Sequence, residues 1–142
     1  MGFAQYLTPE EAAQAAVVNY LRLKYPDVLF YHSPQETFTK SKFQRWKNKV
    51  LGVRAGVPDL LIFRYYFSSN DDLGEIDDEY IAQMYYGLAI EMKHGKGKPT
   101  PAQNDFMNAL ENNGWRCEVC YDSEEAMHVI DEYLGRKELK QK

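Results

Sequence analysis

The pattern of polar and apolar positions near the N-terminus predicts an amphipathic helix. In "LTPEEAAQAAVVNYLRLKYP", Thr8 stands directly before Pro9, and Glu11 follows three residues after Thr8. This spacing is typical of a capping box with proline in the first helical position. The helix should end before Pro26, because the residue that precedes a proline is disfavoured in the helical conformation.

Two further stretches predict helices in the C-terminal part of the chain. In "TPAQNDFMNALENNG", Thr100 is placed as N-cap, Gln103 closes a capping box, and Gly114 is placed at the C-terminal cap. In "SEEAMHVIDEYLG", Ser123 is placed as N-cap of a helix with one apolar face. The tail 136–142 is expected to be frayed.

Short apolar and aromatic runs between these helices predict β-strands. The runs are residues 28–33, 58–67, 80–93 and 115–122, and the second and third are expected to pair antiparallel around the polar stretch 68–79, a plausible hairpin tip. Residues 39–52 can form either a basic helix or a partly ordered loop. The order of the elements predicts an α/β fold, with one mixed sheet flanked by helices and a single domain over residues 1–142.

Composition and charge restrict the class of protein. Of the 142 residues 44% are hydrophobic and 27% charged, which is ordinary for a globular chain. No apolar run reaches membrane-spanning length and the N-terminus has no leader pattern, so we expect a soluble, cytoplasmic protein without a membrane partner. The net charge is −4, which by itself does not favour nucleic acid as a partner.

The charges are nevertheless segregated along the chain. Residues 37–54 carry only basic charges, together with Phe43 and Trp46, whereas residues 71–79 carry only acidic ones. The acidic run is best interpreted as a solvated face, while the basic run is as consistent with a phosphate-contacting surface as with a solvated face. Lys40, Lys42, Arg45, Lys47, Lys49 and Arg54 form the basic run.

The two cysteines spell CxxC, at Cys117 and Cys120, without a second pair that would complete a zinc site. They lie in an expected strand, where residues three apart point to opposite faces. Ordinary reduced cysteines are therefore the favoured interpretation, ahead of a zinc or redox role.

Charged residues interrupt two of the most apolar strands. Asp59 precedes "LLIF", and "LAIEMK" ends in Glu91 and Lys93, which alternation places on one face. If the two strands pair antiparallel, the start of one meets the end of the other, and the three side chains converge at one edge of the sheet. The alternative is a surface ion-pair cluster at that edge.

Two adjacent carboxylates repel each other unless a cation neutralises them. Oxygen ligands without cysteine or histidine nearby favour Mg²⁺ or Mn²⁺, which retain waters and commonly take a phosphate oxygen from the substrate. A lysine beside the ion would orient the attacking water or neutralise developing negative charge. The reaction class indicated is metal-assisted hydrolysis of a phosphodiester.

The same residues resemble a known sequence signature. Pro58-Asp59 followed by Glu91-Met92-Lys93 resembles the PD-(D/E)XK nuclease signature. With "GVRAGVPDLLIF", the GKGK loop, the TPAQ segment and the "SEEAMHVI" helix, the chain is similar to the VRR-NUC family, particularly its small stand-alone phage and bacterial members, from Thr8 to about Leu134. The interval between the acids is long and holds the acidic stretch.

The resemblance implies a restriction-endonuclease-like fold and roles for several residues. Asp59 and Glu91 would bind the metal, Lys93 would be the catalytic lysine, Gln103 would lie beside the site, and Glu11 would complete the metal ligands. Glu11 and Gln103 have capping-box roles as an alternative, and Glu10 competes with Glu11 for the acidic position. His32 is interpreted as a strand-end residue or a DNA contact.

The resemblance also implies a substrate class and an assembly. Stand-alone members are homodimers that cut branched DNA resembling four-way (Holliday) junctions, which suggests a Mg²⁺- or Mn²⁺-dependent, structure-specific endonuclease. Besides the basic run and His32, Lys96 and Lys98 on the glycine-punctuated loop are candidate DNA contacts, and His94 is more simply a solvated loop residue. The alternatives are a nuclease for flaps or linear duplex, of repair or restriction type, and a non-catalytic DNA-binding or assembly module.

Overall fold

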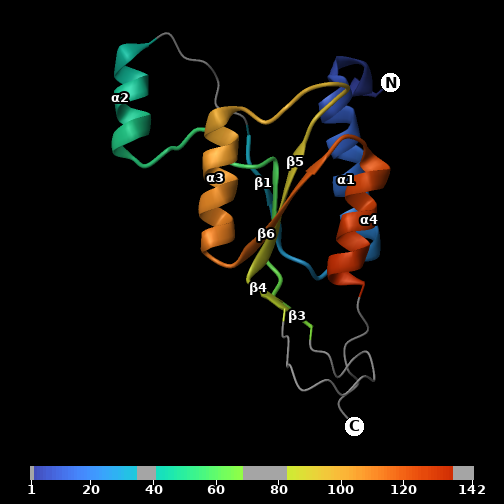
Figure 1. Cartoon of the computed structure of the whole chain (residues 1–142). Coiled ribbons are helices and arrows are strands. Elements are labelled where there is room, and N and C mark those ends of the chain that lie inside the picture. The colour runs from blue at the N-terminus through green and yellow to red at the C-terminus, as the bar shows by residue number, and fades with distance from the viewer. Residues whose placement is uncertain (1, 35–40, 69–82, 136–142) are drawn as a thin grey trace.

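The computed structural model describes residues 2–34, 41–68 and 83–135 (Figure 1). In chain order the elements are the 3-10 turn η1 (Phe3–Tyr6), α1 (Pro9–Lys24), β1 (Phe30–His32), α2 (Lys42–Val50), β2 (Leu60–Ile62), β3 (Tyr66–Ser68), β4 (Gln83–Tyr85), β5 (Gly87–Met92), α3 (Pro101–Asn112), β6 (Trp115–Cys120) and α4 (Ser123–Leu134). The acidic stretch beyond Ser68, Lys40 and the tail 136–142 lie outside the described residues.

A four-stranded mixed sheet in the order β1-β2-β5-β6 forms the centre of the fold. β1, β2 and β5 pair antiparallel, whereas β5 and β6 pair parallel. The parallel pair is joined by α3, because two parallel strands require a crossover connection, which is commonly a helix. The expected α/β class with one mixed sheet is confirmed.

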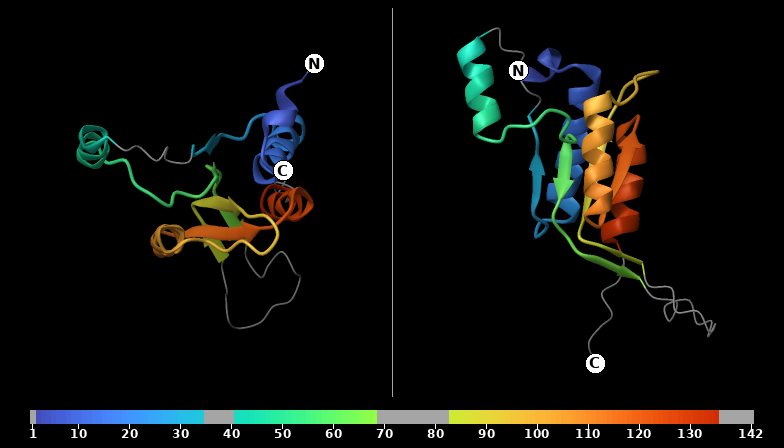
Figure 2. Two further views of the ribbon diagram at one scale, coloured as in Figure 1. Left: turned by 90° about the horizontal axis from the view of Figure 1, so that it is seen from above. Right: turned by 60° about the vertical axis from the view of Figure 1, so that its left-hand side comes forward.

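Helices cover the two faces of the sheet unequally. α1 and α4 pack together on one face (Figure 2), where Leu21, Leu60, Ile90 and Ile130 belong to a fully buried core. α3 lies on the other face over β6, where the Cys117 thiol contacts the carbonyl oxygen of Met107. Asp59 and Glu91 lie at the ends of the two central strands, with α1 near one side and α3 near the other.

The expected caps of α1 and α3 are confirmed. Thr8 Oγ1 accepts from the Glu11 N–H at 3.2 Å, and Thr100 Oγ1 accepts from the Gln103 N–H at 3.2 Å, each within a complete capping box. Each box satisfies backbone donors that a helix start leaves without a partner.

Two expected helix boundaries are wrong by one residue. Asp122, not Ser123, is the N-cap of α4, because its Oδ1 accepts from the Glu125 N–H at 2.7 Å. Asn113 is the C-cap of α3, and Gly114 follows it with φ of +84°.

Residues 58–67 and 80–93 were each expected to form one strand, and this is wrong. Each run is divided, so that β3 and β4 form a separate two-stranded antiparallel sheet. At the break, the Tyr133 hydroxyl donates to the carbonyl oxygen of Arg64 at 2.5 Å, and the Tyr133 ring contacts Tyr66 and Tyr85. Tyr133 of α4 thus provides a hydrogen-bond donor to a carbonyl at the strand break. The local sequence around residue 64 does not reveal this distant partner.

Residues 39–52 were expected to form either a basic helix or a partly ordered loop, and residues Lys42–Val50 form the helix α2. α2 contains no buried residue and stands away from the sheet and the other described helices (Figures 1 and 2). No helix among the described residues has the length and apolar character that crossing a membrane requires.

The cysteines behave as the strand pattern predicts. Cys117 is half-buried on the α3 side, Cys120 is buried in the core on the other side, and both are free thiols. Burial raises the pKa of each thiol to about 12, so neither is a nucleophile near neutral pH.

Candidate active site

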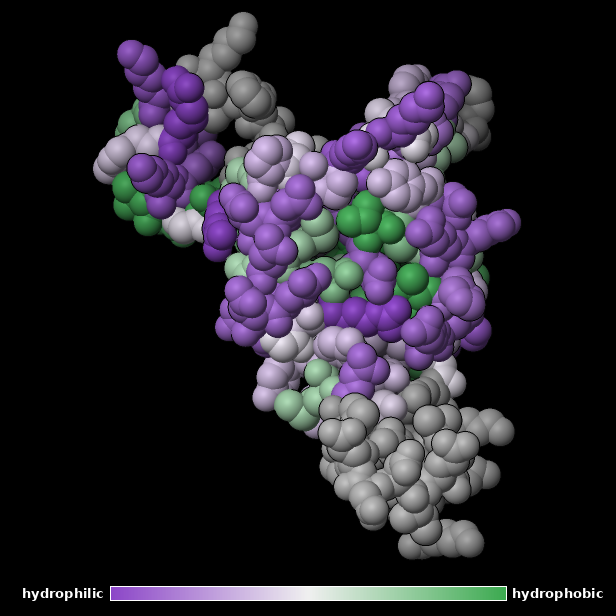
Figure 3. Space-filling model, viewed as in Figure 1, coloured by the Kyte–Doolittle hydropathy of each residue, from purple (hydrophilic) through white to green (hydrophobic). Residues whose placement is uncertain are grey.

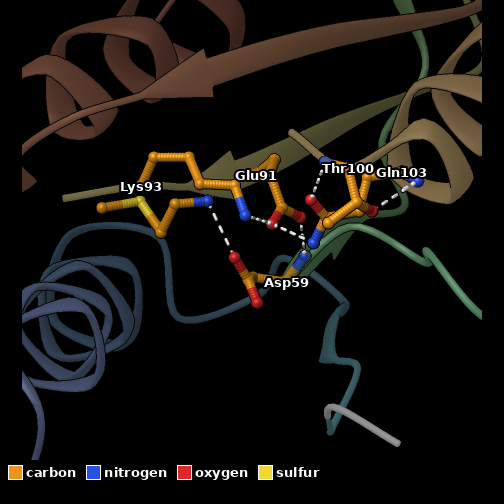
Figure 4. Close-up of polar contacts among 6 residues, drawn as sticks. Asp59, Glu91, Lys93, Thr100 and Gln103 are labelled. Atoms are coloured by element: carbon orange, nitrogen blue, oxygen red, sulfur yellow. Dashed lines mark hydrogen bonds and ion pairs between the residues drawn. The ribbon is translucent and has the colours of Figure 1, made fainter. Parts of the chain in front are cut away.

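Asp59 and Glu91 meet at one edge of the sheet, as the antiparallel pairing predicts. The register sets Leu60 opposite Ile90, which brings the residue before β2 beside the residue after Ile90. The two side chains lie next to each other (Figure 4). Asp59 is 5% exposed and Glu91 is fully buried. Two buried carboxylates in adjacent strands are costly to ionise and rarely serve packing alone.

Backbone amides hold the two carboxylates in place. The Asp59 N–H donates to Glu91 Oε2 at 3.2 Å, and the Met92 N–H donates to Asp59 Oδ2 at 2.8 Å. Each strand therefore supplies a backbone donor to the acid of the other strand. The side chains cannot reorient without breaking hydrogen bonds that also tie β2 to β5.

Lys93 and Gln103 converge on the other oxygen of Glu91. Lys93 Nζ lies 3.3 Å from Glu91 Oε1, and Gln103 Nε2 donates to the same oxygen at 2.8 Å. Gln103 Oε1 also accepts from the Thr100 N–H at 2.8 Å (Figure 4). One side chain thus closes the α3 cap and contacts Glu91, which is the position that each of the two interpretations of Gln103 requires.

The electrostatics of the pair follow from burial. Desolvation, reinforced by the charge of Asp59, raises the pKa of Glu91 to about 7, while the Lys93 ammonium acts in the opposite direction. A carboxyl that is poised near neutral pH beside a second carboxylate and a lysine is the kind of group found at functional sites.

Gly56 fixes the loop that delivers Asp59. Its φ is +85°, and a Cβ at this position would lie 2.3 Å from the carbonyl oxygen of Ala102 in the first turn of α3. The backbone of the Asp59 loop thus lies directly against the turn that carries Gln103, an approach that only glycine permits.

An open cleft of about 790 Å³ lies between α1 and the start of β2. Asp59 lines it from the sheet, whereas Glu10, Glu11 and Gln14 line it from α1, and Arg22 lies further along the same helix. Glu11 thus faces the cleft that Asp59 faces, while its Oε2 accepts from the Thr8 N–H at 3.3 Å as the capping-box interpretation predicts. Glu10 also lines the cleft, so both acids of this turn remain candidates.

His32 contacts the backbone of Asp59. Its Nδ1 lies 2.8 Å from the Asp59 carbonyl oxygen and also contacts the Gln14 amide. The Asp59 carbonyl can only accept and the Gln14 amide nitrogen can only donate, so Nδ1 serves one of these two partners at a time. Gln14 lines the cleft and contacts His32; the sequence prediction assigned it no role, although its position one turn after Glu10 and Glu11 was a usable signal.

The candidate DNA contacts lie on the surface. Lys42, Arg45, Lys47 and Lys49 are exposed on α2, and Lys96, Lys98 and His94 are exposed on the loop after β5. Arg54 stacks over the Phe106 ring of α3 at 5.0 Å, which anchors the return from α2 to the sheet. None of these residues contacts Asp59 or Glu91 among the contacts described.

The donor chemistry of the carboxylate pair fits a hard cation. Mg²⁺ is commonly held by one or two carboxylates, with waters and substrate phosphate completing its shell, and Asp59 and Glu91 supply two such groups whose mutual repulsion a cation would relieve. The described residues do not bring a third acid, histidine or cysteine into one ligand cluster with them. Glu11 therefore lies across the cleft rather than within a preformed triad.

Comparison with known proteins agrees with this arrangement. The model of the VRR-NUC domain matches residues 4–124. A solved structure described as a VRR_NUC domain protein is 25% identical, covers 91% of this chain and 90% of its own, and superposes with a TM-score of 0.66. No curated protein matches. The family match spans most of the chain and includes every residue of the carboxylate site, so the chain belongs to the VRR-NUC family and is a nuclease-type domain.

Proposed function

We propose that this protein is a metal-dependent DNA endonuclease whose active site is the Asp59–Glu91 pair. The observation that carries the proposal is the buried convergence of two carboxylates and one lysine beside an open cleft. A non-catalytic binding module has no need to retain two buried acids that destabilise each other, because removing one would relieve the repulsion.

The residues would divide the work as follows. Asp59 and Glu91 would hold Mg²⁺ or Mn²⁺, with Glu11 approaching from across the cleft. When bound, such a cation supplies charge that offsets the negative charge of the reacting phosphate and lowers the pKa of a bound water. Lys93, whose side chain is 11% exposed and 3.3 Å from Glu91, would orient the attacking water, and Gln103 would hold Glu91 in position.

The reaction is hydrolysis of a phosphodiester. Water supplies a hydroxyl to phosphorus and a proton to the leaving oxygen, and one P–O bond breaks. The exposed basic residues of α2 and of the loop after β5 would hold the DNA backbone, with His32 at the cleft wall and Arg54 behind them. Contacts of this type fix position without reading sequence.

We propose branched DNA, such as a four-way junction, as the preferred substrate and a homodimer as the active assembly. The exposed basic helix stands apart from the carboxylate site, so contacts on it would engage DNA at a distance from the scissile bond. A two-fold symmetric pair of such chains would present two equivalent sites to a symmetric substrate.

The test is cleavage of a labelled four-way junction and of matched linear duplex and flap substrates, with Mg²⁺, with Mn²⁺ and with chelator. Wild type, Asp59→Asn and Lys93→Met are compared. We expect metal-dependent cleavage of the junction that either substitution abolishes while DNA binding in chelator persists. Preferential cutting of flaps or linear duplex would identify these, and not the four-way junction, as the preferred substrate. Metal-independent DNA binding without any cleavage would identify a binding module.

A further inference from the structure

Helix α2 carries an apolar stripe that no described element covers. Phe43, Trp46 and Val50 recur at intervals of three and four residues, which places them on one side of the helix. They are 68%, 60% and 63% exposed, and the Phe43 and Trp46 rings lie 5.9 Å apart. Figure 3 shows hydrophobic surface at the base of this helix beside its basic residues.

Three of the four basic residues of α2 follow a separate stripe. Lys42, Arg45 and Lys49 also recur at three and four residues, rotated about the helix from the aromatic stripe, whereas Lys47 lies at the margin of that stripe, one turn after Phe43. A helix that contacted only DNA phosphates would need the basic stripe alone. The aromatic stripe therefore indicates a second binding partner.

The main sheet has a matching uncovered face. Tyr31 lies opposite Leu61 in the register, and Leu61 lies opposite Ala89 on the α3 side of the sheet. Because α3 lies over β6, no described helix covers β1 and β2 on this side, which the right-hand view of Figure 2 shows. Leu29, Tyr31 and Phe63 are large hydrophobic residues that are exposed there.

We propose that α2 of one chain packs its Phe43–Trp46–Val50 stripe on the Leu29–Tyr31–Phe63 face of a second copy. Within the described residues, α2 stands off its own sheet, so its stripe is available to a neighbouring molecule. The exchange is reciprocal, because each chain offers one arm and one face, and two-fold symmetry forms both contacts at once.

Charge supports a second copy as the occupant. All 21 acidic residues of the chain lie outside residues 37–54, and that segment carries Lys40, Lys42, Arg45, Lys47, Lys49 and Arg54. A basic arm therefore meets an acidic body in the other chain, which is electrostatically favourable. This inference rests on the proposed function in one respect, because it assigns a surface to the homodimer proposed there.

The test measures mass by sedimentation velocity, without DNA or metal, and uses arm and face variants. Trp46→Glu alters the arm and Tyr31→Glu alters the face. Gln44→Glu, on the polar side of α2, and Leu23→Glu, on the exposed side of α1 away from this face, introduce the same charge as controls. We expect wild type and both controls at twice 16.6 kDa and each test variant at 16.6 kDa.

Mixing the two test variants distinguishes this exchange from other contacts. A mixed pair has one unaltered arm and one unaltered face that meet, so a heterodimer with one intact contact should reappear, which native mass spectrometry of differently tagged chains detects. Circular dichroism of each variant verifies folding.

Three results would overturn the proposal. The first is a wild type at 16.6 kDa, as an arm closed on its own sheet would give. The second is a Tyr31→Glu variant that stays dimeric, and the third is a Trp46→Glu variant that stays dimeric. Nuclease activity is measured separately, so a dimer that fails to cut would refute the enzyme while leaving the interface standing.

Discussion

Asp59 and Glu91 each hold in place the strand that carries the other. The Asp59 backbone donates to the Glu91 carboxylate, and the backbone after Glu91 donates to the Asp59 carboxylate. The two acids of the site are therefore part of the pairing between β2 and β5. Substitutions that keep these hydrogen bonds but remove charge separate the chemistry of the site from its structural role.

Glu91→Gln should lose less stability than wild type as the pH rises, although a glutamine has only one oxygen to accept from the Asp59 N–H or from Gln103. The pKa of Glu91 is raised to about 7 from an ordinary 4.5, so the folded state binds the proton more tightly than the unfolded state. The stabilisation is complete below about pH 4.5 and is lost as the pH rises through 7, by roughly 3 kcal/mol at the usual 1.4 kcal/mol per pKa unit.

Urea unfolding in chelator at pH 5 and pH 8 measures this effect. We expect the difference in free energy of unfolding between Glu91→Gln and wild type to grow with pH, while the exposed Glu111→Gln control follows wild type. A constant difference across this range would contradict the raised pKa.

A bound metal ion should offset the stability that the protein loses when Glu91 ionises beside Asp59. If Asp59 and Glu91 hold the cation, millimolar Mg²⁺ or Mn²⁺ should raise the Tm of wild type, since a ligand that binds only the folded state stabilises it. Asp59→Asn and Glu91→Gln should lose most of the shift in differential scanning fluorimetry. An equal shift in all three proteins would place the ion elsewhere.

Lys93→Met should remove activity without removing DNA affinity. Lys93 contacts Glu91 and is 11% exposed, so it is poorly placed to contribute to long-range attraction of DNA. We expect kcat to fall by about 100-fold or more, the usual cost of losing one charge-stabilising group. Single-turnover cleavage and a Kd in chelator measure the two effects, and a parallel loss of both would assign Lys93 to binding.

Gln103 should act through Glu91 beyond its contribution to the helix cap. Gln103→Ala and Thr100→Ala both break the α3 capping box, at about 1 kcal/mol each, but only the first removes the hydrogen bond to Glu91. Gln103→Ala should also shift the pH profile of cleavage toward higher pH, because Glu91 loses a donor to its charged form. Identical pH profiles in the two variants would show that Gln103 acts only as part of the α3 capping box.

Gly56→Ala should unfold the site, whereas Gly52→Ala should not. Both glycines have positive φ, +85° and +86°, and this alone costs an alanine about 1 kcal/mol. At Gly56 the new methyl would also meet the Ala102 carbonyl at 2.3 Å, while at Gly52 nothing lies within 4 Å. Thermal unfolding should show about 1 kcal/mol for Gly52→Ala and about 2–4 kcal/mol for Gly56→Ala.

The parts of the site that follow from local rules were predictable from sequence. Strand alternation placed Glu91 and Lys93 on one face, and antiparallel pairing brought Asp59 to Glu91. The caps of α1 and α3 followed from residue types three positions apart. These rules involve neighbours in sequence or in register, which a single chain displays directly.

The parts that depend on distant contacts were not predictable. Tyr133 takes the carbonyl of Arg64 at the strand break across 69 positions, and α2 leaves the sheet although its sequence shows only that it is a basic, aromatic helix. Asp122 displaces Ser123 as a cap because its carboxylate reaches Glu125 three residues on, whereas both residue types are suitable caps in isolation.

The contact between Gly56 and the first turn of α3 has a consequence for when the site forms during synthesis of the chain. The Asp59 loop is packed against residues translated more than forty positions later, and Glu91 receives its amide donor from that same turn. A growing chain therefore lacks the packing against Gly56 and the Gln103 contact to Glu91 until α3 has been synthesised and has docked. If the site cleaves DNA as proposed, its full set of contacts would form only at the end of folding, when α3 docks on the Asp59 loop.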